Sequence, residues 1–517
     1  MIRTSKLFRA LALCTSAALL LGTASACPLF VHTKGDQSLS QVLEGIRTAL
    51  GQTANTMSKG LRLSGTSEDM NAEGTVQLTL LPNGRYHRLL DTSMPSREAY
   101  DGEHVLVRDW NDTPSRLHLA DRETALLQAW FVSGDWLEPS NGLSLGLIGQ
   151  NPTRLSVSFP GGHVQGQVRL DTTTGRPACL VIPTGEMEIT TELSQWKKFD
   201  GRQVPCDVRI GSGPGQATHF RFDKLQTLEE VPADLFAPMK AKPRGTRYLE
   251  RRSPLVNIRR APTGHLMIPA LVNGKDHGWF LLDTGAATLC ISGDVAQSAR
   301  MKPVGSTRAV GVAGSTKAGF RRARQLAIGP LVMDNPIFLQ LDLSFLEPAF
   351  GVKIAGICGT EMFHRAIFEI DLAENELVIH ETLEDDDLVW RPLSFLGRIP
   401  AMTATYEGDR TGLFRFDSGS AKVLEFDADT VEEFGLIEKR KVHETQVGGV
   451  GGSRSADEGE LAWVEFAGHR TSAPLVTFSR SGPTAKRAPS TDGVFGLGII
   501  PGMAIVFDYG DERYAVR

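Results

Sequence analysis

Apolar and polar residues alternate along many short runs between residues 60 and 238, and Gly, Pro, Asn and Asp separate the runs. A period of two is typical of strands with one buried face, and the separating residues favour turns. Apolar residues at helical spacing in 37–57 and in RETALLQAWFV (122–132) predict helices beside these strands. The pattern predicts a curved, half-barrel-like antiparallel sheet with a helix or two on one face. The whole chain is predicted to be mainly β, with few helices.

Two aspartates break this alternation, because each ends an apolar strand. LLDTGAATLCIS contains Asp283 and FRFDSGSAKVLEF contains Asp417, and each aspartate is followed by Thr or Ser and then Gly. A buried carboxylate is costly unless it is paired or shares a proton. Two such tripeptides in one chain predict that the two aspartates are partners.

The surroundings of the two aspartates repeat as well. A predicted hairpin leads into each aspartate strand, and an apolar-Gly element follows at Gly359 and Gly496. Asp417 follows Asp283 by 134 positions, and Gly496 follows Gly359 by 137, so the two copies keep their register. The sequence therefore predicts an internal duplication that forms two β lobes, at 255–390 and 391–517.

Paired aspartates carry a known chemistry. Two carboxylates about 3 Å apart cannot both ionise, so they share one proton. The charged member can take a proton from a water molecule while the other donates to a scissile carbonyl. The motifs at Asp283 and Asp417 resemble those of aspartic peptidases of the pepsin and retropepsin type. The resemblance implies a bilobal acid-protease β-barrel fold and an aspartic-type endopeptidase that cleaves extended polypeptide without a cofactor or metal.

The same resemblance assigns supporting roles around the pair. Hydroxyl groups of Thr284 and Ser418 would cross-link the two aspartate loops. Ala286 stands where pepsin-type enzymes have a hydroxyl that bonds the carboxylate, and Ser420 keeps that hydroxyl in the second copy. Because losing a hydrogen bond to the charged form raises a carboxyl pKa, we expect activity in weaker acid or at neutral pH. The supporting residues are Thr284, Gly285, Ser418, Gly419 and Ser420, and the glycines allow an approach that a Cβ would block.

Glycine-rich stretches at 308–320 and 445–459 fit flaps, the hairpins that close over a bound peptide. Neither stretch contains the tyrosine typical of the pepsin flap, so two retropepsin-like flaps are expected. Ordinary exposed turns are the alternative. The flap glycines are Gly311, Gly314, Gly448 and Gly449.

The region 27–238 resembles the half-barrels of lipoprotein carriers and receptors, the LolA/LolB-like fold. Its helix, its long strands and the stretches AYDGEHVLVRDW and KKFDGRQVPCDVRI carry the resemblance, which implies a cupped sheet able to hold an acyl chain or a peptide. A β domain that only packs or tethers is the alternative, and a removable pro-segment is a third. Residues 239–254 are rich in basic residues and are predicted to be a linker.

The N-terminus predicts export. A basic start, a short apolar stretch and small residues before Cys27 are typical of a bacterial secretory signal over residues 1–26. Cys27 is a candidate for lipidation, which would be the only membrane attachment. We expect a periplasmic protein or a membrane-anchored lipoprotein. The formal charge of −5 gives no electrostatic case for nucleic acid as a partner.

Four cysteines remain beyond Cys27, in a compartment that permits disulfides. Pairing of Cys179 with Cys206 and of Cys290 with Cys358 is one hypothesis, and buried thiols are the other. The functional hypothesis is an envelope aspartic endopeptidase. Its alternative is a non-catalytic or weakly catalytic binding protein that holds lipid or lipoprotein in the N-terminal half-barrel.

Overall fold

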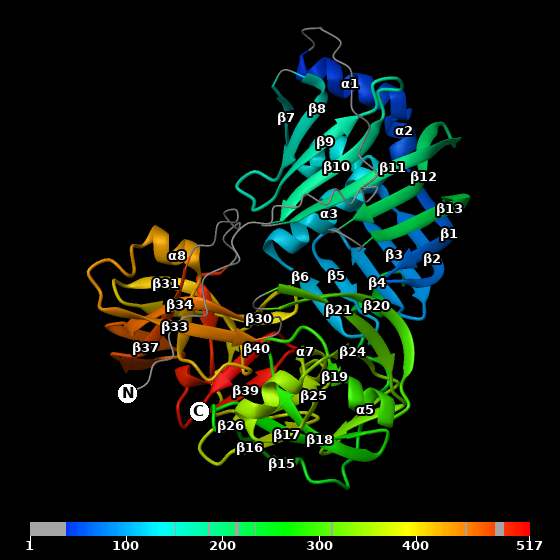
Figure 1. Cartoon of the computed structure of the whole chain (residues 1–517). Coiled ribbons are helices and arrows are strands. Elements are labelled where there is room, and N and C mark those ends of the chain that lie inside the picture. The colour runs from blue at the N-terminus through cyan, green and yellow to red at the C-terminus, as the bar shows by residue number, and fades with distance from the viewer. Residues whose placement is uncertain are drawn as a thin grey trace, which may run out of the picture.

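The computed structural model of the chain describes residues 38–149, 151–184, 187–211, 217–232, 234–311, 314–449, 452–480 and 491–517. The predicted signal at 1–26 and Cys27 lie outside these ranges. Most of the elements are strands, which confirms the predicted fold class (Figure 1). No helix in the described ranges is long and apolar enough to cross a membrane.

The N-terminal sheet has thirteen antiparallel strands in the order β6-β5-β4-β3-β2-β1-β13-β12-β11-β10-β9-β8-β7. Neighbouring strands in the sheet are also consecutive in the chain, with one exception. The exception is the pair of β1 and β13, which brings the two ends of the region together. The strands are β1 (Gly60–Asp69), β2 (Ala72–Leu80), β3 (Tyr86–Thr92), β4 (Ser96–Tyr100), β5 (Val105–Arg108), β6 (Pro114–Leu117), β7 (Ser144–Ile148), β8 (Asn151–Ser158), β9 (Gln165–Leu170), β10 (Pro177–Thr184), β11 (Met187–Phe199), β12 (Arg202–Gly211) and β13 (Ala217–Leu228).

Helix α3 (Leu119–Ser133) lies in the hollow of this sheet (Figure 1). It contacts β5 near one edge as well as β10 and β12, so the sheet must curve around it. The helix predicted over 37–57 is two helices, α1 (Leu39–Leu50) and α2 (Ala54–Met57). Gly51 ends α1 because it adopts φ 65°, a left-handed conformation that suits glycine.

The duplicated region contains two equivalent sheets, each built around one aspartate strand. In the first, the central order is β18-β25-β19-β24, and in the second it is β31-β38-β32-β37. The pairings also agree: β18 is parallel to β25 as β31 is to β38, and β19 is antiparallel to β25 as β32 is to β38.

The first sheet has eleven strands: β14 (Thr246–Tyr248), β16 (Arg259–Arg260), β17 (Leu266–Val272), β18 (Lys275–Leu282), β19 (Cys290–Ser292), β20 (Lys302–Gly311), β21 (Gly314–Arg322), β22 (Gln325–Ile328), β23 (Leu331–Asp334), β24 (Ile337–Leu341) and β25 (Ile354–Cys358). The second has ten: β29 (Ser394–Leu396), β30 (Ile399–Tyr406), β31 (Arg410–Phe416), β32 (Leu424–Phe426), β33 (Val442–Gly449), β34 (Gly452–Glu460), β35 (Trp463–Phe466), β36 (His469–Ser472), β37 (Leu475–Ser479) and β38 (Gly493–Phe495). The short helices are α4 (Ala237–Lys240), α5 (Gly293–Ser298), α6 (Glu347–Phe350), α7 (Thr360–Phe363) and α8 (Ala428–Glu433).

A six-stranded sheet joins the two halves. Strand β26 of the first half pairs with β39 of the second, with Phe368 opposite Phe507, and one large apolar core spans both halves. The order of this sheet is β15 (Leu255–Asn257), β27 (Glu376–His380), β26 (Ile367–Asp371), β39 (Ala504–Asp508), β40 (Arg513–Val516) and β28 (Arg391–Pro392).

Part of the predicted linker at 239–254 is a strand. Strand β14 pairs with β23 at the edge of the eleven-stranded sheet. Its Arg247 bonds both carboxylate oxygens of Asp334, at 2.7 and 2.8 Å, and Arg244 bonds Asp112 in the N-terminal region. Two basic residues of the predicted linker therefore have carboxylate partners far away in the sequence, although both side chains remain exposed, and sequence spacing does not reveal such partners.

The cysteines do not form the hypothetical disulfides. Cys206, Cys290 and Cys358 are thiols, and both members of each proposed pair are buried. Burial raises the pKa of the Cys290 and Cys358 thiols, which keeps them protonated.

Candidate active site

Each aspartate stands at the end of a buried strand, and a backbone hydrogen bond to the neighbouring parallel strand holds each one in the same way. The backbone N–H of Asp283 donates to the carbonyl of Cys358 at 3.1 Å, just beyond the parallel pair β18 and β25. The N–H of Asp417 donates to the carbonyl of Phe495 at 2.9 Å, beyond β31 and β38. The duplication thus delivers the two carboxylates from equivalent positions.

Four hydrogen bonds connect the two aspartate loops. The Ser418 hydroxyl accepts from the N–H of Thr284 at 2.9 Å and donates to the Leu282 carbonyl at 3.0 Å. The Thr284 hydroxyl accepts from the N–H of Ser418 at 2.9 Å and donates to the Phe416 carbonyl at 2.9 Å. Both side chains are fully buried. The cross-link expected from the two hydroxyl groups is present and nearly symmetric.

The glycines of the two loops face the opposite carboxylates. A Cβ on Gly285 would lie 2.5 Å from the Asp417 carboxyl, and a Cβ on Gly419 would lie 2.6 Å from that of Asp283. Any side chain at either position would displace a carboxylate. The two carboxyl groups also hydrogen-bond to each other, so the structure brings Asp283 and Asp417 together.

The two carboxyl groups are half-buried and differ in their electrostatics. Burial is the main cause that raises the pKa of Asp283 well above its ordinary value, and the charge of Asp417 adds to it. Burial also raises the pKa of Asp417, whereas hydrogen bonds from Asp283 and the N–H of Gly419 act in the opposite direction. The pKa values of both carboxyl groups are therefore raised, and the two groups titrate as a coupled pair.

Ala286 and Ser420 occupy matching positions but have different partners. The N–H of Ala286 donates to the Asp283 carboxylate at 3.0 Å, so the backbone supplies a bond where the hydroxyl is missing. The Ser420 hydroxyl accepts a 3.4 Å bond from the N–H of Lys422 and does not bond Asp417. The expected bond from Ser420 to the second carboxylate is thus not formed.

The apolar-Gly elements pack behind the aspartate loops. A Cβ on Gly359 would lie 2.4 Å from the Thr288 carbonyl, and a Cβ on Gly496 would lie 2.5 Å from the Lys422 carbonyl. Glycine at these positions allows each element to lie directly against the chain that follows its aspartate.

Two hairpins occupy the predicted flap positions. β20 and β21 pair from Lys302 to Gly311, where Gly314 stands opposite. β33 and β34 pair in the same way and end with Gly449 opposite Gly452, one residue beyond Gly448. The residues between the paired glycines lie outside the described ranges.

Two nearby residues gave no signal in the sequence. His265 donates to the carbonyl of Gly419, and burial lowers its pKa. Glu361 is fully buried on α7 and accepts from the Thr288 hydroxyl and the N–H of Leu289, both at 2.9 Å. A lone His or Glu has no diagnostic spacing, so only its neighbours in space reveal it. Within the described residues, no group of three or more His, Cys, Asp or Glu could hold a metal ion.

Comparison with known proteins adds a partial match. Residues 268–362, which include Asp283, match the family model described as aspartyl protease. The chain is similar to conglutin gamma, a unique basic 7S globulin from lupine seeds, at 10% identity and a TM-score of 0.34 over 51% of this chain and 94% of that chain. It is similar to an aspartic proteinase from Irpex lacteus at 9% identity and a TM-score of 0.35 over 51% of this chain and 96% of that chain. No curated protein matches the sequence.

Proposed function

We propose that this protein is an aspartic endopeptidase in which Asp283 and Asp417 activate water against a peptide bond. The observation that carries the proposal is the pair itself: two half-buried carboxyl groups from duplicated strands, each facing the glycine of the opposite aspartate loop. The family match at 268–362 supports the same chemistry. No cofactor is needed for it.

We assign a different role to each aspartate. Asp417 is assigned as the ionised member, because its pKa is raised less than that of Asp283. It acts as the base that takes a proton from the attacking water. Asp283 keeps the proton and donates it to the scissile carbonyl oxygen. The buried cross-link between Thr284 and Ser418 holds the two carboxyl groups at this separation.

The substrate is an extended polypeptide. The hairpins β20–β21 and β33–β34 act as flaps that close over it. A bound peptide pairs with strand edges, because main-chain hydrogen bonds suit any extended sequence.

The decisive experiment compares the wild type with Asp283→Asn and Asp417→Asn on a peptide library between pH 3 and 8, with and without pepstatin. Asp294→Asn is the matched control, because Asp294 is an exposed aspartate on α5 whose ion pair with Lys353 is open to solvent. We expect pepstatin-sensitive cleavage by the wild type and the control, and none by the two pair variants. Cleavage that persists in Asp283→Asn refutes the assignment.

The predicted location is the bacterial envelope, which is also part of the proposal. Expression of the full chain in a bacterium, followed by fractionation, tests it. A lipid anchor on Cys27 predicts that Cys27→Ser moves the protein from the membrane to the soluble fraction. Recovery of the wild type in the cytoplasm contradicts export.

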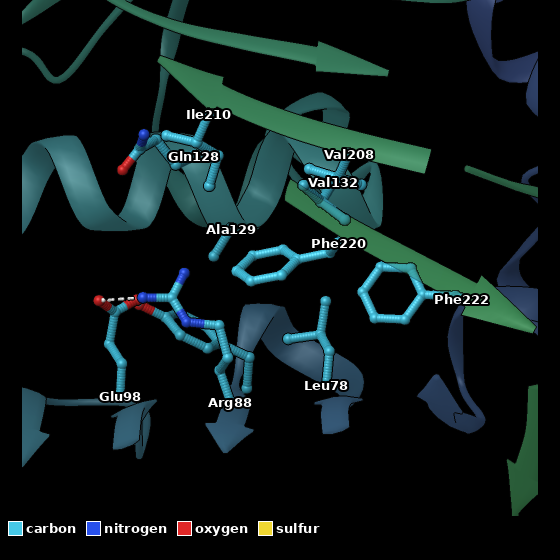
Figure 2. A pocket seen from close by; sticks show the side chains of 11 residues that line it. Leu78, Arg88, Glu98, Gln128, Ala129, Val132, Val208, Ile210, Phe220 and Phe222 are labelled. Carbon is cyan, nitrogen blue, oxygen red and sulfur yellow. Dashed lines mark hydrogen bonds and ion pairs between the residues drawn. The ribbon is translucent and has the colours of Figure 1, made fainter. Parts of the chain in front are cut away.

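A pocket in the N-terminal region favours a second candidate function, the binding of an acyl chain. The cavity between α3 and the sheet is small, about 30 Å³, and it opens to solvent. An acyl chain would therefore have to widen it by moving α3 away from the sheet. Figure 2 shows Phe220, Phe222 and Leu78 on its sheet side and Val132 on its helix side. A polar group stands at one end, where Arg88 bonds Glu98 at 2.9 Å.

Displacement of a fluorescent fatty acid tests this candidate on the full chain. Ala129→Trp fills the pocket from α3 and is expected to abolish binding. Asp283→Asn leaves the pocket intact and serves as the control. Equal binding by both variants excludes this pocket as the site.

A further inference from the structure

The turn between β5 and β6 projects from the N-terminal sheet into the body that carries the aspartates. Asp109 shapes the turn, because its carboxylate accepts from the N–H groups of Asn111 and Thr113, both at 2.8 Å. Asp112 adopts φ 58° at the bend. Asp109, Asn111 and Thr113 are all buried although they belong to a turn. We call residues 109–113 the docking turn.

Both the oxygen and the nitrogen of the Asn111 side-chain amide, at the centre of the docking turn, are hydrogen-bonded. Its amide oxygen accepts from the N–H of Ile337 at 2.8 Å, and its amide nitrogen donates to the carbonyl of Ile337 at 2.9 Å. The same nitrogen donates to the Glu361 carboxylate at 2.9 Å. Asn111 thus binds the first residue of β24 and also reaches the buried Glu361 behind the first aspartate loop.

Glu361 in turn bonds residues of the loop that follows Asp283. Its carboxylate oxygens accept from the Thr288 hydroxyl and from the N–H of Leu289. These residues end the loop that begins at Asp283, and the loop returns from them to β19. The path from Asn111 to the end of the aspartate loop is therefore two hydrogen bonds long.

The docking turn also contacts the second half of the body. The Asp109 carboxylate is fully buried and bonds Arg398 at 2.6 Å, and Arg398 lies 3.7 Å from Glu361. Burial and the charge of Asp109 raise the pKa of Glu361 to about 8, and Arg398 acts in the opposite direction. Removing the turn would leave the Glu361 carboxyl and the Arg398 guanidinium without the partners that it supplies, which is costly for buried polar groups.

We propose that the docking turn is a positioning element of the peptidase site, in which Asn111 fixes Glu361 and thereby the loop that carries Asp283. The inference rests on the proposed peptidase function for its catalytic consequence only. It implies that the N-terminal region is a permanent part of the enzyme and not a removable pro-segment.

Hydrogen–deuterium exchange of the full chain tests the positioning role without any need for activity. Asn111→Ala should make the Leu289 amide exchange about tenfold faster, because its acceptor Glu361 is no longer held. Asn71→Ala is the matched control. Asn71 also bridges the two parts of the chain, by a 2.7 Å bond to Ser306, but it does not contact Glu361. The control should leave Leu289 at the wild-type rate.

Kinetics supply the second readout. Because a misplaced catalytic group lowers the chemical step, we expect Asn111→Ala to lower kcat about tenfold and to leave KM within about twofold. If the wild type cleaves nothing, the peptidase proposal fails, and the exchange at Leu289 still decides this inference. Unchanged exchange at Leu289, or an equal rise over the whole chain, overturns it.

A second variant covers the case in which Asn111→Ala fails to fold. Asn111→Asp keeps the oxygen that accepts from Ile337 and removes both amide donors. It should still accelerate the exchange of Leu289. A wild-type rate in this variant also overturns the proposal.

Discussion

Removing the hydroxyl group of Ser418 tests the cross-link between the two aspartate loops. In Ser418→Ala, the N–H of Thr284 and the carbonyl of Leu282 lose their partner inside a fully buried site. A buried polar group left without a partner costs about 1–3 kcal/mol, so the two together cost about 2–6 kcal/mol. We therefore expect the free energy of opening of this region to fall by that amount.

Ser420→Ala is the matched control on the same loop. The Ser420 hydroxyl is half-buried and accepts only a long 3.4 Å bond, from the N–H of Lys422. Its loss should cost no more than about 1 kcal/mol. Both variants remove one oxygen atom from a serine, so the difference between them reports the buried bonds.

The assay is hydrogen exchange of the full chain in increasing urea, read on peptides that cover the strands β18 and β31. A single unfolding transition is not expected for a chain with several folded parts, so a local measurement is required. Equal losses in the two serine variants, or a loss below about 1 kcal/mol in Ser418→Ala, would refute the reasoning.

Four further predictions concern the pair, its glycines and the N-terminal region. The folded pKa of Asp283 lies above its unfolded value, so its contribution to stability is present below about pH 4 and is lost as the pH rises through the folded value. Asp283→Asn should therefore raise the free energy of opening of β18, measured by hydrogen exchange, relative to the wild type more at pH 7 than at pH 4, and an equal change at both would contradict the raised pKa. Hydrolysis should continue above pH 5 in the wild type because burial raises the pKa of Asp283, and its abolition there would contradict that raised pKa. Gly285→Ala puts a methyl group 2.5 Å from the Asp417 carboxyl and should lower the free energy of opening of β18 by more than about 2 kcal/mol in the same exchange measurement, whereas Gly45→Ala, with open space around it on α1, should not. Cutting an engineered protease site inserted into the exposed segment 229–232 should leave the two pieces together in gel filtration, and release of the N-terminal piece would favour the pro-segment alternative.

Much of the fold followed from local pattern. The period-two alternation predicted the antiparallel N-terminal sheet, and RETALLQAWFV predicted α3 within a few residues of its ends. The prediction of helix over 37–57 was wrong in its length. Gly51 takes a left-handed conformation and ends α1 there. Local pattern identifies such elements well, whereas their ends depend on single residues.

The sequence predicted part of the candidate site, again from a local pattern. The repeated tripeptides selected Asp283 and Asp417, since a charged residue at the end of an apolar strand is a visible exception. The sequence could not show that the Ser420 hydroxyl turns toward Lys422, or that the Ala286 amide supplies a bond to Asp283. Each of these two hydrogen bonds depends on the backbone conformation of the one or two residues around it in the loop.

The sequence by itself determined where strands run and which carboxyl groups need a partner, because periodicity and the cost of burying a charge are properties of each segment. Only the tertiary structure decided which distant groups meet. Arg247 of the predicted linker bonds Asp334, and Asn111 in a turn of the N-terminal region bonds Glu361 behind the aspartate loop. Such contacts join residues far apart in the chain, and they exist only once the sheets have packed. No sequence pattern within either segment predicts these contacts.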